Sequence, residues 1–181
     1  MNARRMTPVS AGSVGIALLT LLSSLGCAST ELSRLVFPQS SLPSGVHLAE
    51  WDGSDKLPWM DRNPFFTRDA RIIERAEVED GNRIPFGSVR EVAFVLYEYE
   101  AANLSEEICL IGTVFQGPSQ AGNAAEALRA WYQQEPRDTH NVYTVLCNGR
   151  IVCILSQEHD IPPDVQRAMV RLTESALQKE R

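Results

Sequence analysis

The sequence predicts an α+β fold, a two-layer sandwich in which two amphipathic helices pack against a mostly antiparallel sheet. Two runs rich in β-branched and aromatic residues, 89–100 and 108–115, follow one another along the chain. A stretch with helical periodicity comes next, and the hairpin-like run 141–157 precedes a second helical stretch. The expected order of elements is therefore ββαββα.

The first 26 residues have the composition of a secretory signal peptide. Arg4 and Arg5 give a cationic start, and residues 14–22 (VGIALLTLL) form an uncharged apolar core. This core is shorter than the roughly 20 residues that a membrane-spanning helix needs. Small residues then lead to Cys27. We expect residues 1–26 to act as an export signal.

The stretch Ser24-Leu25-Gly26-Cys27 resembles the lipobox of bacterial lipoproteins, in which the cysteine is acylated and becomes the mature N-terminus. Gly26 and Cys27 match that pattern, whereas Ser24 and Leu25 stand where the family usually has a leucine and a small residue. The resemblance implies lipid on the Cys27 sulfur and amine, which would hold the protein stably on a membrane. A signal cut after Ala28, giving a secreted protein, and an uncleaved anchor are the alternatives.

Residues 27–64 are expected to comprise the lipid-bearing cysteine and a tether, because proline, serine and glycine recur there without a sustained period. A coil of about 30 residues reaches roughly 30 Å. Trp51 and Trp59 are unusual in a free linker, so we expect one or both to pack on the domain. Residues 65–181 are expected to form one globular domain.

Residues 65–78 fit two patterns. An alternation of apolar and charged side chains favours a strand, but Asp69, Ile72, Ile73 and Ala76 also fall on one face of a helix. The strand is the interpretation we favour, followed by a turn at residues 80–82.

The run 89–100 (VREVAFVLYEYE) is expected to be a central strand, since both of its faces are apolar in the middle. Residues 101–105 then turn the chain into the strand 108–115 (ICLIGTVF). Alternation assigns two faces to the first strand, one with Val92, Phe94, Leu96 and Glu98 and the other with Ala93, Val95, Tyr97 and Tyr99.

The first amphipathic helix is expected after residues 117–119 (GPS), which break the sheet. Asn123 and Glu126 have the spacing of a capping box, and Pro136 ends the helix near Gln134. Its apolar stripe comprises Ala121, Ala124, Ala125, Leu128, Trp131 and Tyr132.

Asn148-Gly149 between two apolar runs predicts a hairpin with a two-residue type I′ turn. In that register Cys147 faces Arg150, and Cys147 and Cys153 lie on opposite faces of the sheet. These two cysteines therefore cannot form a disulfide with each other, and any bridge must use Cys109.

The last helix is expected to open at residues 161–164 (IPPD), because proline is tolerated in a first turn. Its apolar stripe comprises Ile161, Val165, Met169, Leu172 and Ala176.

The formal charge is −6 for the whole chain and −8 for residues 27–181, so acidic residues outnumber basic ones in the expected mature protein. This balance argues against a nucleic-acid partner and against direct adhesion to anionic lipid head groups.

No catalytic, cofactor-binding or metal-binding constellation is recognisable, and we expect no enzymatic activity and no cofactor. His140 and His159 flank the hairpin, and Glu158 or Asp160 would be the nearest third ligand for a metal. Solvated loop histidines are the interpretation we favour. His47 lies apart from them in the expected tether.

Two further groups of side chains could form a site, but solvent exposure or core packing is the explanation we favour for each. Paired carboxylates could come from Glu98, Glu100, Glu106 and Glu107, although such runs usually form a solvated rim. A pocket between helix and sheet could be lined by Tyr97, Tyr99, Trp131 and Tyr132, although aromatic side chains on a core face usually only pack.

The sequence thus predicts an extracytoplasmic domain of the cell envelope or periplasm, anchored to a membrane by lipid on Cys27. Its expected role is to bind a protein partner or to support envelope assembly. A small-molecule binder or sensor with a helix–sheet cleft, and an enzyme of unrecognised type, are the alternatives.

Overall fold

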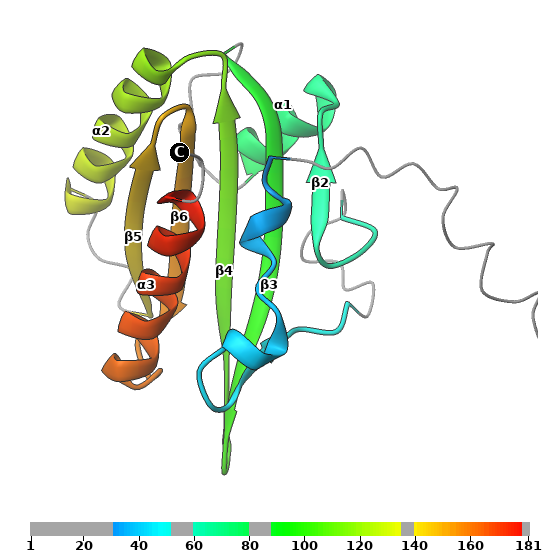
Figure 1. The fold of residues 1–181 in the computed structure, drawn as a ribbon, viewed down its shortest axis with the longest axis vertical. Helices are drawn as coiled ribbons and strands as arrows, with labels where there is room; N and C mark the ends of the chain where they lie inside the picture. Colours follow the sequence, from blue (N-terminus) through cyan, green and yellow to red (C-terminus); the bar gives the residue numbers. More distant parts are fainter. Residues whose placement is uncertain (1–30, 52–59, 80–87, 135–139, 179–181) are drawn as a thin grey trace, which may run out of the picture.

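The computed structural model describes residues 31–51, 60–79, 88–134 and 140–178. These residues form a six-stranded antiparallel sheet, three α-helices and two short 3-10 turns (Figure 1). The α+β class and the order of two strands, helix, two strands and helix are confirmed. Further elements precede that order: the turns η1 (Ser33–Leu35) and η2 (Gln39–Ser41), the strands β1 (Val46–Leu48) and β2 (Phe65–Thr67), and the helix α1 (Ala70–Glu79).

The sheet is built around the long hairpin of β3 (Val89–Ala101) and β4 (Leu104–Phe115). The strand order is β1-β3-β4-β6-β5, and β2 also pairs with β3. The two short strands lie along the same edge of β3, β1 opposite residues 97–99 and β2 opposite residues 92–94. The second hairpin, β5 (Asn141–Asn148) and β6 (Ile151–Glu158), extends the sheet on the other side of β4.

Side chains of β3 alternate between two hydrophobic cores, one on each face of the sheet, as the sequence predicts. Val92, Phe94 and Leu96 contribute to one core. The opposite core contains Ala93, Val95, Tyr97 and Tyr99. Both faces of the sheet therefore need cover from elements elsewhere in the chain.

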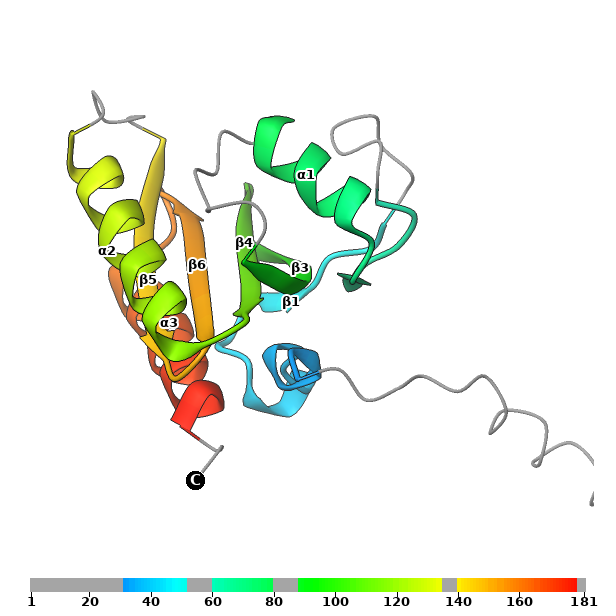
Figure 2. The same cartoon turned by 90° about the horizontal axis from the view of Figure 1, so that it is seen from above.

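The two predicted helices provide that cover on opposite faces of the sheet. The helix α2 (Pro118–Gln134) packs its alanine-rich stripe and Leu128 into the same core as Phe94. The helix α3 (Pro163–Gln178) packs Val165 and Met169 into the core that contains Tyr97. Figure 2 shows α1 and the N-terminal segment on opposite sides of β3 and β4. Helices therefore pack on both faces of the sheet and do not form a single layer on one face.

The N-terminal segment is part of the fold, so the prediction of a tether over residues 27–64 is wrong for residues 31–51 and 60–64. Leu32 and Leu35 are fully buried, and β1 is a strand of the sheet. The segment fills the face of the sheet that α3 leaves uncovered. Trp51 is half-buried and packs against the core of α2, as expected, whereas Trp59 lies outside the described residues.

The predicted strand over residues 65–78 is wrong beyond Thr67, because Ala70–Glu79 is a helix. Asp69 begins this helix: its side chain accepts a hydrogen bond from the Arg71 amide at 2.9 Å. The Asp69 carbonyl oxygen accepts the amides of residues 72 and 73. Ile73 is buried in the core of α2, so tertiary packing and the cap outweigh the strand-like alternation.

Helix α2 begins at Pro118, so the predicted capping box at Asn123 and Glu126 is wrong. Gly117 precedes the helix, and its carbonyl oxygen accepts the Ala121 amide at 3.2 Å. Proline suits the first helical position because its missing N–H would have no helical partner there. Asn123 is therefore an exposed residue within the helix.

The β5–β6 hairpin is confirmed, but its predicted register is wrong. Cys147 pairs with Val152 instead of Arg150, and the turn residues are Gly149 and Arg150. Gly149 has a φ of +56°, and among these two residues only it has a positive φ, which is the pattern of a type II′ turn. Asn148 stays in the strand, where its side-chain amide donates to the Leu177 carbonyl oxygen at 2.5 Å.

A substitution at Gly112 of β4 tests whether residues 31–37 pack against the sheet. A Cβ atom there would clash with the Leu35 side chain and lie 3.2 Å from Leu32 Cδ2. We expect Gly112→Ala to lower the free energy of unfolding by about 1–3 kcal/mol, the usual cost of overpacking. Urea denaturation measures this change.

Gly122→Ala is the matched control, because a Cβ at this position in α2 meets nothing within 4 Å. Removing a glycine from a helix should raise stability by up to about 1 kcal/mol. If both variants changed stability equally, the close packing of the N-terminal segment on β4 would be contradicted.

Candidate functional site

The N-terminal segment is joined to the sheet by the Tyr97 side chain. The Tyr97 hydroxyl donates a hydrogen bond to the Leu35 carbonyl oxygen at 2.8 Å and accepts one from the Phe37 amide at 2.9 Å. The Phe37 and Tyr97 rings stack with their centroids 5.8 Å apart. Tyr97 is fully buried, and this burial raises its pKa to about 12. The packing interpretation of Tyr97 is therefore the one the structure supports.

A second attachment lies at the start of the described chain. Arg150, in the β5–β6 turn, donates from both its Nε and terminal nitrogen to the two carboxylate oxygens of Glu31. The Nε contact is 3.1 Å, and both side chains are about one-third exposed. Bidentate arginine–carboxylate pairs fix orientation as well as position. Glu31 is four positions after Cys27, so the fold begins close to the predicted lipid.

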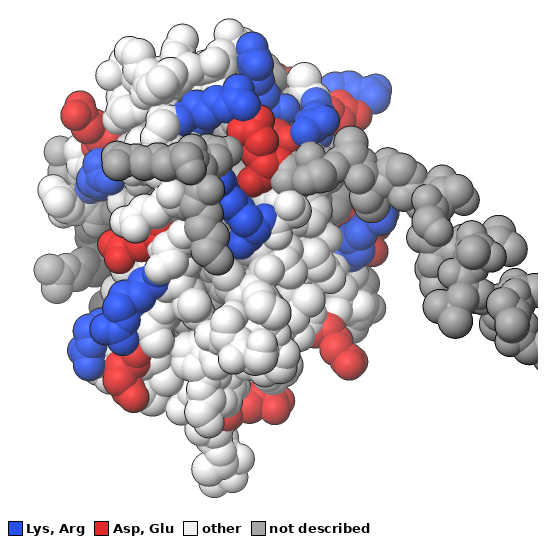
Figure 3. All heavy atoms as spheres, viewed as in Figure 1, with Lys and Arg blue, Asp and Glu red and all other residues white. Residues whose placement is uncertain are grey.

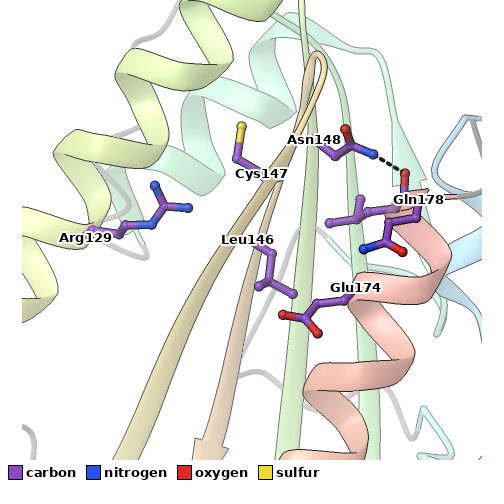
Figure 4. Close-up of a pocket in the computed structure, with 7 residues that line it drawn as sticks. Arg129, Leu146, Cys147, Asn148, Glu174 and Gln178 are labelled. Carbon is purple, nitrogen blue, oxygen red and sulfur yellow. Dashed lines mark hydrogen bonds between the residues drawn. The ribbon is translucent and has the colours of Figure 1, made fainter.

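A groove of about 630 Å³ runs across the free edge of the sheet at β5 (Figure 4). Arg129 approaches from α2 and Glu174 from α3, on either side of the strand. Arg129 donates to the Val145 carbonyl oxygen at 3.1–3.3 Å and so occupies one outward-facing acceptor of the edge. A guanidinium and a carboxylate on opposite walls would suit a polar or extended ligand.

Aromatic side chains lie beside this groove. Tyr132 of α2 and Tyr143 of β5 stack with their centroids 4.3 Å apart, and Trp131 lies 4.7 Å from Tyr132. Tyr143 and Val142 are 36% and 37% exposed, and they are the large exposed apolar residues of the described chain. Trp131 and Tyr132 are half-buried, so this cluster lies at the surface and not in an internal cleft.

His140 and His159, which flank the hairpin, lie side by side at its open end. The His159 amide donates to the His140 carbonyl oxygen at 2.7 Å. Both residues line a depression of about 390 Å³ with Glu106, Glu158 and Asp160. Within the described residues, their side chains do not form a cluster of three converging metal-ligand atoms.

One such cluster does occur elsewhere in the described chain, and the sequence interpretation missed it. His47, Glu98 and Glu100 each offer a ligand atom, and the three atoms all lie within 4.8 Å of one another. The sequence places His47 in the expected tether and gives no signal for its pairing with Glu98 across β1 and β3. Of the four glutamates considered as paired carboxylates, Glu98 and Glu100 are the two brought together here.

Cys147 and Cys153 are free thiols. Cys147 and Cys153 lie on adjacent strands with their side chains on opposite faces, as predicted. Burial raises the pKa of the Cys153 thiol to about 12. Cys147 is exposed, and its pKa is also raised by partial burial, with Arg129 opposing the shift. Neither thiol has the lowered pKa of a catalytic nucleophile.

Charged side chains are distributed unevenly on the face that carries α3 and the N-terminal segment. Figure 3 shows acidic and basic groups interleaved toward the end of the molecule where the β5–β6 turn lies, and a broad uncharged area below them. On the described part of this face, neither sign of charge forms a large patch.

Comparisons with protein-family models, curated proteins and solved structures find no match to this chain. None of the helices in the described ranges has the length and apolarity needed to cross a bilayer. A functional assignment must therefore come from the residues of the chain itself.

Tyr97→Phe tests the attachment of the N-terminal segment. The change removes one hydroxyl and leaves the Leu35 carbonyl and the Phe37 amide without their buried partner. We expect the free energy of unfolding to fall by about 1–3 kcal/mol in urea denaturation. Tyr99→Phe is the control, because no partner of the Tyr99 hydroxyl is found in the described residues; a loss of equal size there would contradict the account.

Alkaline pH should weaken the same attachment. A Tyr97 pKa of about 12, above the ordinary value of 10.0, means that the unfolded chain ionises first. The resulting stabilisation is complete below pH 10 and is lost as pH rises toward 12. The stability gap between the wild type and Tyr97→Phe should therefore narrow between these values in urea titrations. A gap that stays constant would argue against a buried neutral phenol.

Proposed function

We propose that this protein is a lipid-anchored extracytoplasmic domain, attached to a membrane through Cys27, that binds a protein partner or supports assembly of the cell envelope. The observation that carries this proposal is the position of Glu31. This residue is only four positions after Cys27, and its carboxylate is bound to Arg150 of the folded domain. A signal, an acylated cysteine and an immediately following folded segment form one continuous attachment.

Chain length limits the distance between the lipid and the fold. Four extended residues span at most about 14 Å, so Glu31 stays within that distance of Cys27. The domain is therefore held against the membrane, whereas the tether expected from sequence would have let it range about 30 Å away. Close attachment restricts which surfaces a partner can reach.

Orientation follows from the same contact. Glu31 pairs with the β5–β6 turn, and the turn between β3 and β4 lies at the opposite end of the sheet (Figure 1). The β5–β6 end should face the membrane, and the β3–β4 turn should point away from it. The groove at β5 would then lie on the side of the domain that is nearer the lipid surface.

A protein partner is favoured over an enclosed small molecule. The described residues bury their large apolar side chains in two cores, and the groove at β5 is an open depression lined mostly by polar and charged side chains. The exposed Val142 and Tyr143 lie on an edge strand, where a polypeptide can make both apolar and backbone contacts.

Cys27→Ala should release the protein from membranes, because it removes the sulfur that would carry the lipid. We expect the wild type in the membrane pellet after fractionation and the variant in the soluble or secreted fraction. Mass spectrometry of the wild-type N-terminus should show a mature chain that begins at acylated Cys27.

Cys147→Ala is the matched control, since it removes an exposed thiol that is distant in sequence from the signal. This variant should fractionate with the wild type. The anchor proposal fails if Cys27→Ala stays in the pellet, or if the native product retains residues 1–26 with a free thiol at Cys27.

A further inference from the structure

We propose that His47, Glu98 and Glu100 form a binding site for a divalent transition-metal ion of the Zn²⁺ class. Their three ligand atoms lie within 4.8 Å of one another on the sheet, at the end that carries the β3–β4 turn. This site is independent of the proposed lipid anchor, because it uses none of the residues that attach the N-terminus.

Strand pairing places the ligands on one face. His47 of β1 lies directly opposite Glu98 of β3. Glu100 is two residues further along β3 and therefore points to the same face. A site built from adjacent strands holds its ligands more firmly than one built from a loop.

The distances are those of a site that needs only small side-chain adjustments. His47 Nε2 and Glu98 Oε2 are 3.6 Å apart. Tetrahedral coordination with bonds near 2.0–2.1 Å separates two ligand atoms by about 3.4 Å. The carboxylate of Glu100 would move inward by a rotamer change, which its exposure permits.

Ser105 orients the Glu98 carboxylate. The Ser105 hydroxyl donates to Glu98 Oε1 at 2.6 Å, and the other oxygen, Oε2, is the one nearer His47. Outer hydrogen bonds of this kind fix a ligating carboxylate and leave one oxygen for the metal. Ser105 of β4 lies opposite Glu100 of β3, so the pairing of these two strands brings the Ser105 hydroxyl close to Glu98.

Electrostatics favours a cation at this position. Glu107 lies opposite Glu98 in the β3–β4 register, so three carboxylates share one face of adjacent strands. Within the described residues, neither Glu98 nor Glu100 has a lysine or arginine partner. Like charges close together on a sheet destabilise it, and a divalent ion held between Glu98 and Glu100 would offset the repulsion between these two carboxylates.

The ligand types select the class of metal. One imidazole and two carboxylates, with positions left open to water, are typical of open Zn²⁺ sites and of related first-row ions. Mg²⁺ and Ca²⁺ prefer oxygen ligands alone. His47 and Glu98 are 35% and 33% exposed, which leaves room for water ligands. The chain therefore should bind Zn²⁺ in preference to Mg²⁺ or Ca²⁺.

Equilibrium dialysis of the purified full-length chain in detergent against Zn²⁺, with metal quantification, tests this proposal. The wild type should bind one Zn²⁺ per chain in the presence of excess Mg²⁺ and Ca²⁺. His47→Ala, Glu98→Gln and Glu100→Gln should each weaken binding at least tenfold. Their urea denaturation without metal should show a folded protein, which separates lost ligation from lost structure.

His159→Ala and Glu106→Gln are the matched controls, since they change the same residue types in the neighbouring depression. Both should bind Zn²⁺ as the wild type does, and Zn²⁺ should raise the melting temperature of the controls but not that of Glu100→Gln. The proposal is overturned if the wild type shows no saturable binding, if Mg²⁺ or Ca²⁺ competes equally, or if His159→Ala weakens binding as much as His47→Ala.

Discussion

The Tyr97 hydroxyl joins two parts of the protein that are some 60 residues apart in the chain, the N-terminal segment and the central strand β3. Its two hydrogen bonds satisfy one backbone carbonyl and one backbone amide that would otherwise be buried without partners. Because an unsatisfied buried group costs about 1–3 kcal/mol, the segment and the tyrosine depend on each other. Gly112 allows Leu32 and Leu35 to approach β4 beside this contact. One face of the sheet is completed in this way.

The position of the N-terminal segment has consequences at both ends of the sheet. At the β5–β6 end, Arg150 holds Glu31 and brings the start of the fold close to Cys27. At the β3–β4 end, the same segment continues into β1 and sets His47 beside Glu98. One stretch of chain thus connects the proposed attachment to the membrane with the proposed metal site. The two sites would lie at opposite ends of the domain.

Much of the fold could be predicted from the sequence in segments whose structure depends on the pattern of neighbouring residues. The central strand 89–101, the second hairpin and the apolar stripes of α2 and α3 follow from alternation, a turn glycine and helical spacing. Their faces were predicted correctly because side-chain direction depends only on neighbouring residues. The hairpin register was missed, since Asn148-Gly149 and Gly149-Arg150 both offer a glycine for the turn.

The N-terminal segment could not be predicted because its structure depends on partners far along the chain. Prolines and serines between its apolar residues hide any period, and its strand is only three residues long. Leu32 and Leu35 are buried because Gly112, about 80 residues further along the chain, leaves space for their side chains. The cluster of His47 with Glu98 was missed for the same reason. Helix α1 was misassigned because its cap at Asp69 competes with a strand-like alternation.

Native-state hydrogen exchange of the backbone amides tests the central claim most directly. The Phe37 amide is bonded to Tyr97, and the amides of residues 35 and 36 are bonded within η1. If the N-terminal segment belongs to the core, the Phe37 amide should exchange as slowly as amides in the middle of β3 and β4. Exchange of the Phe37 amide at the rate of an unstructured peptide, with β3 and β4 still protected, would contradict the account.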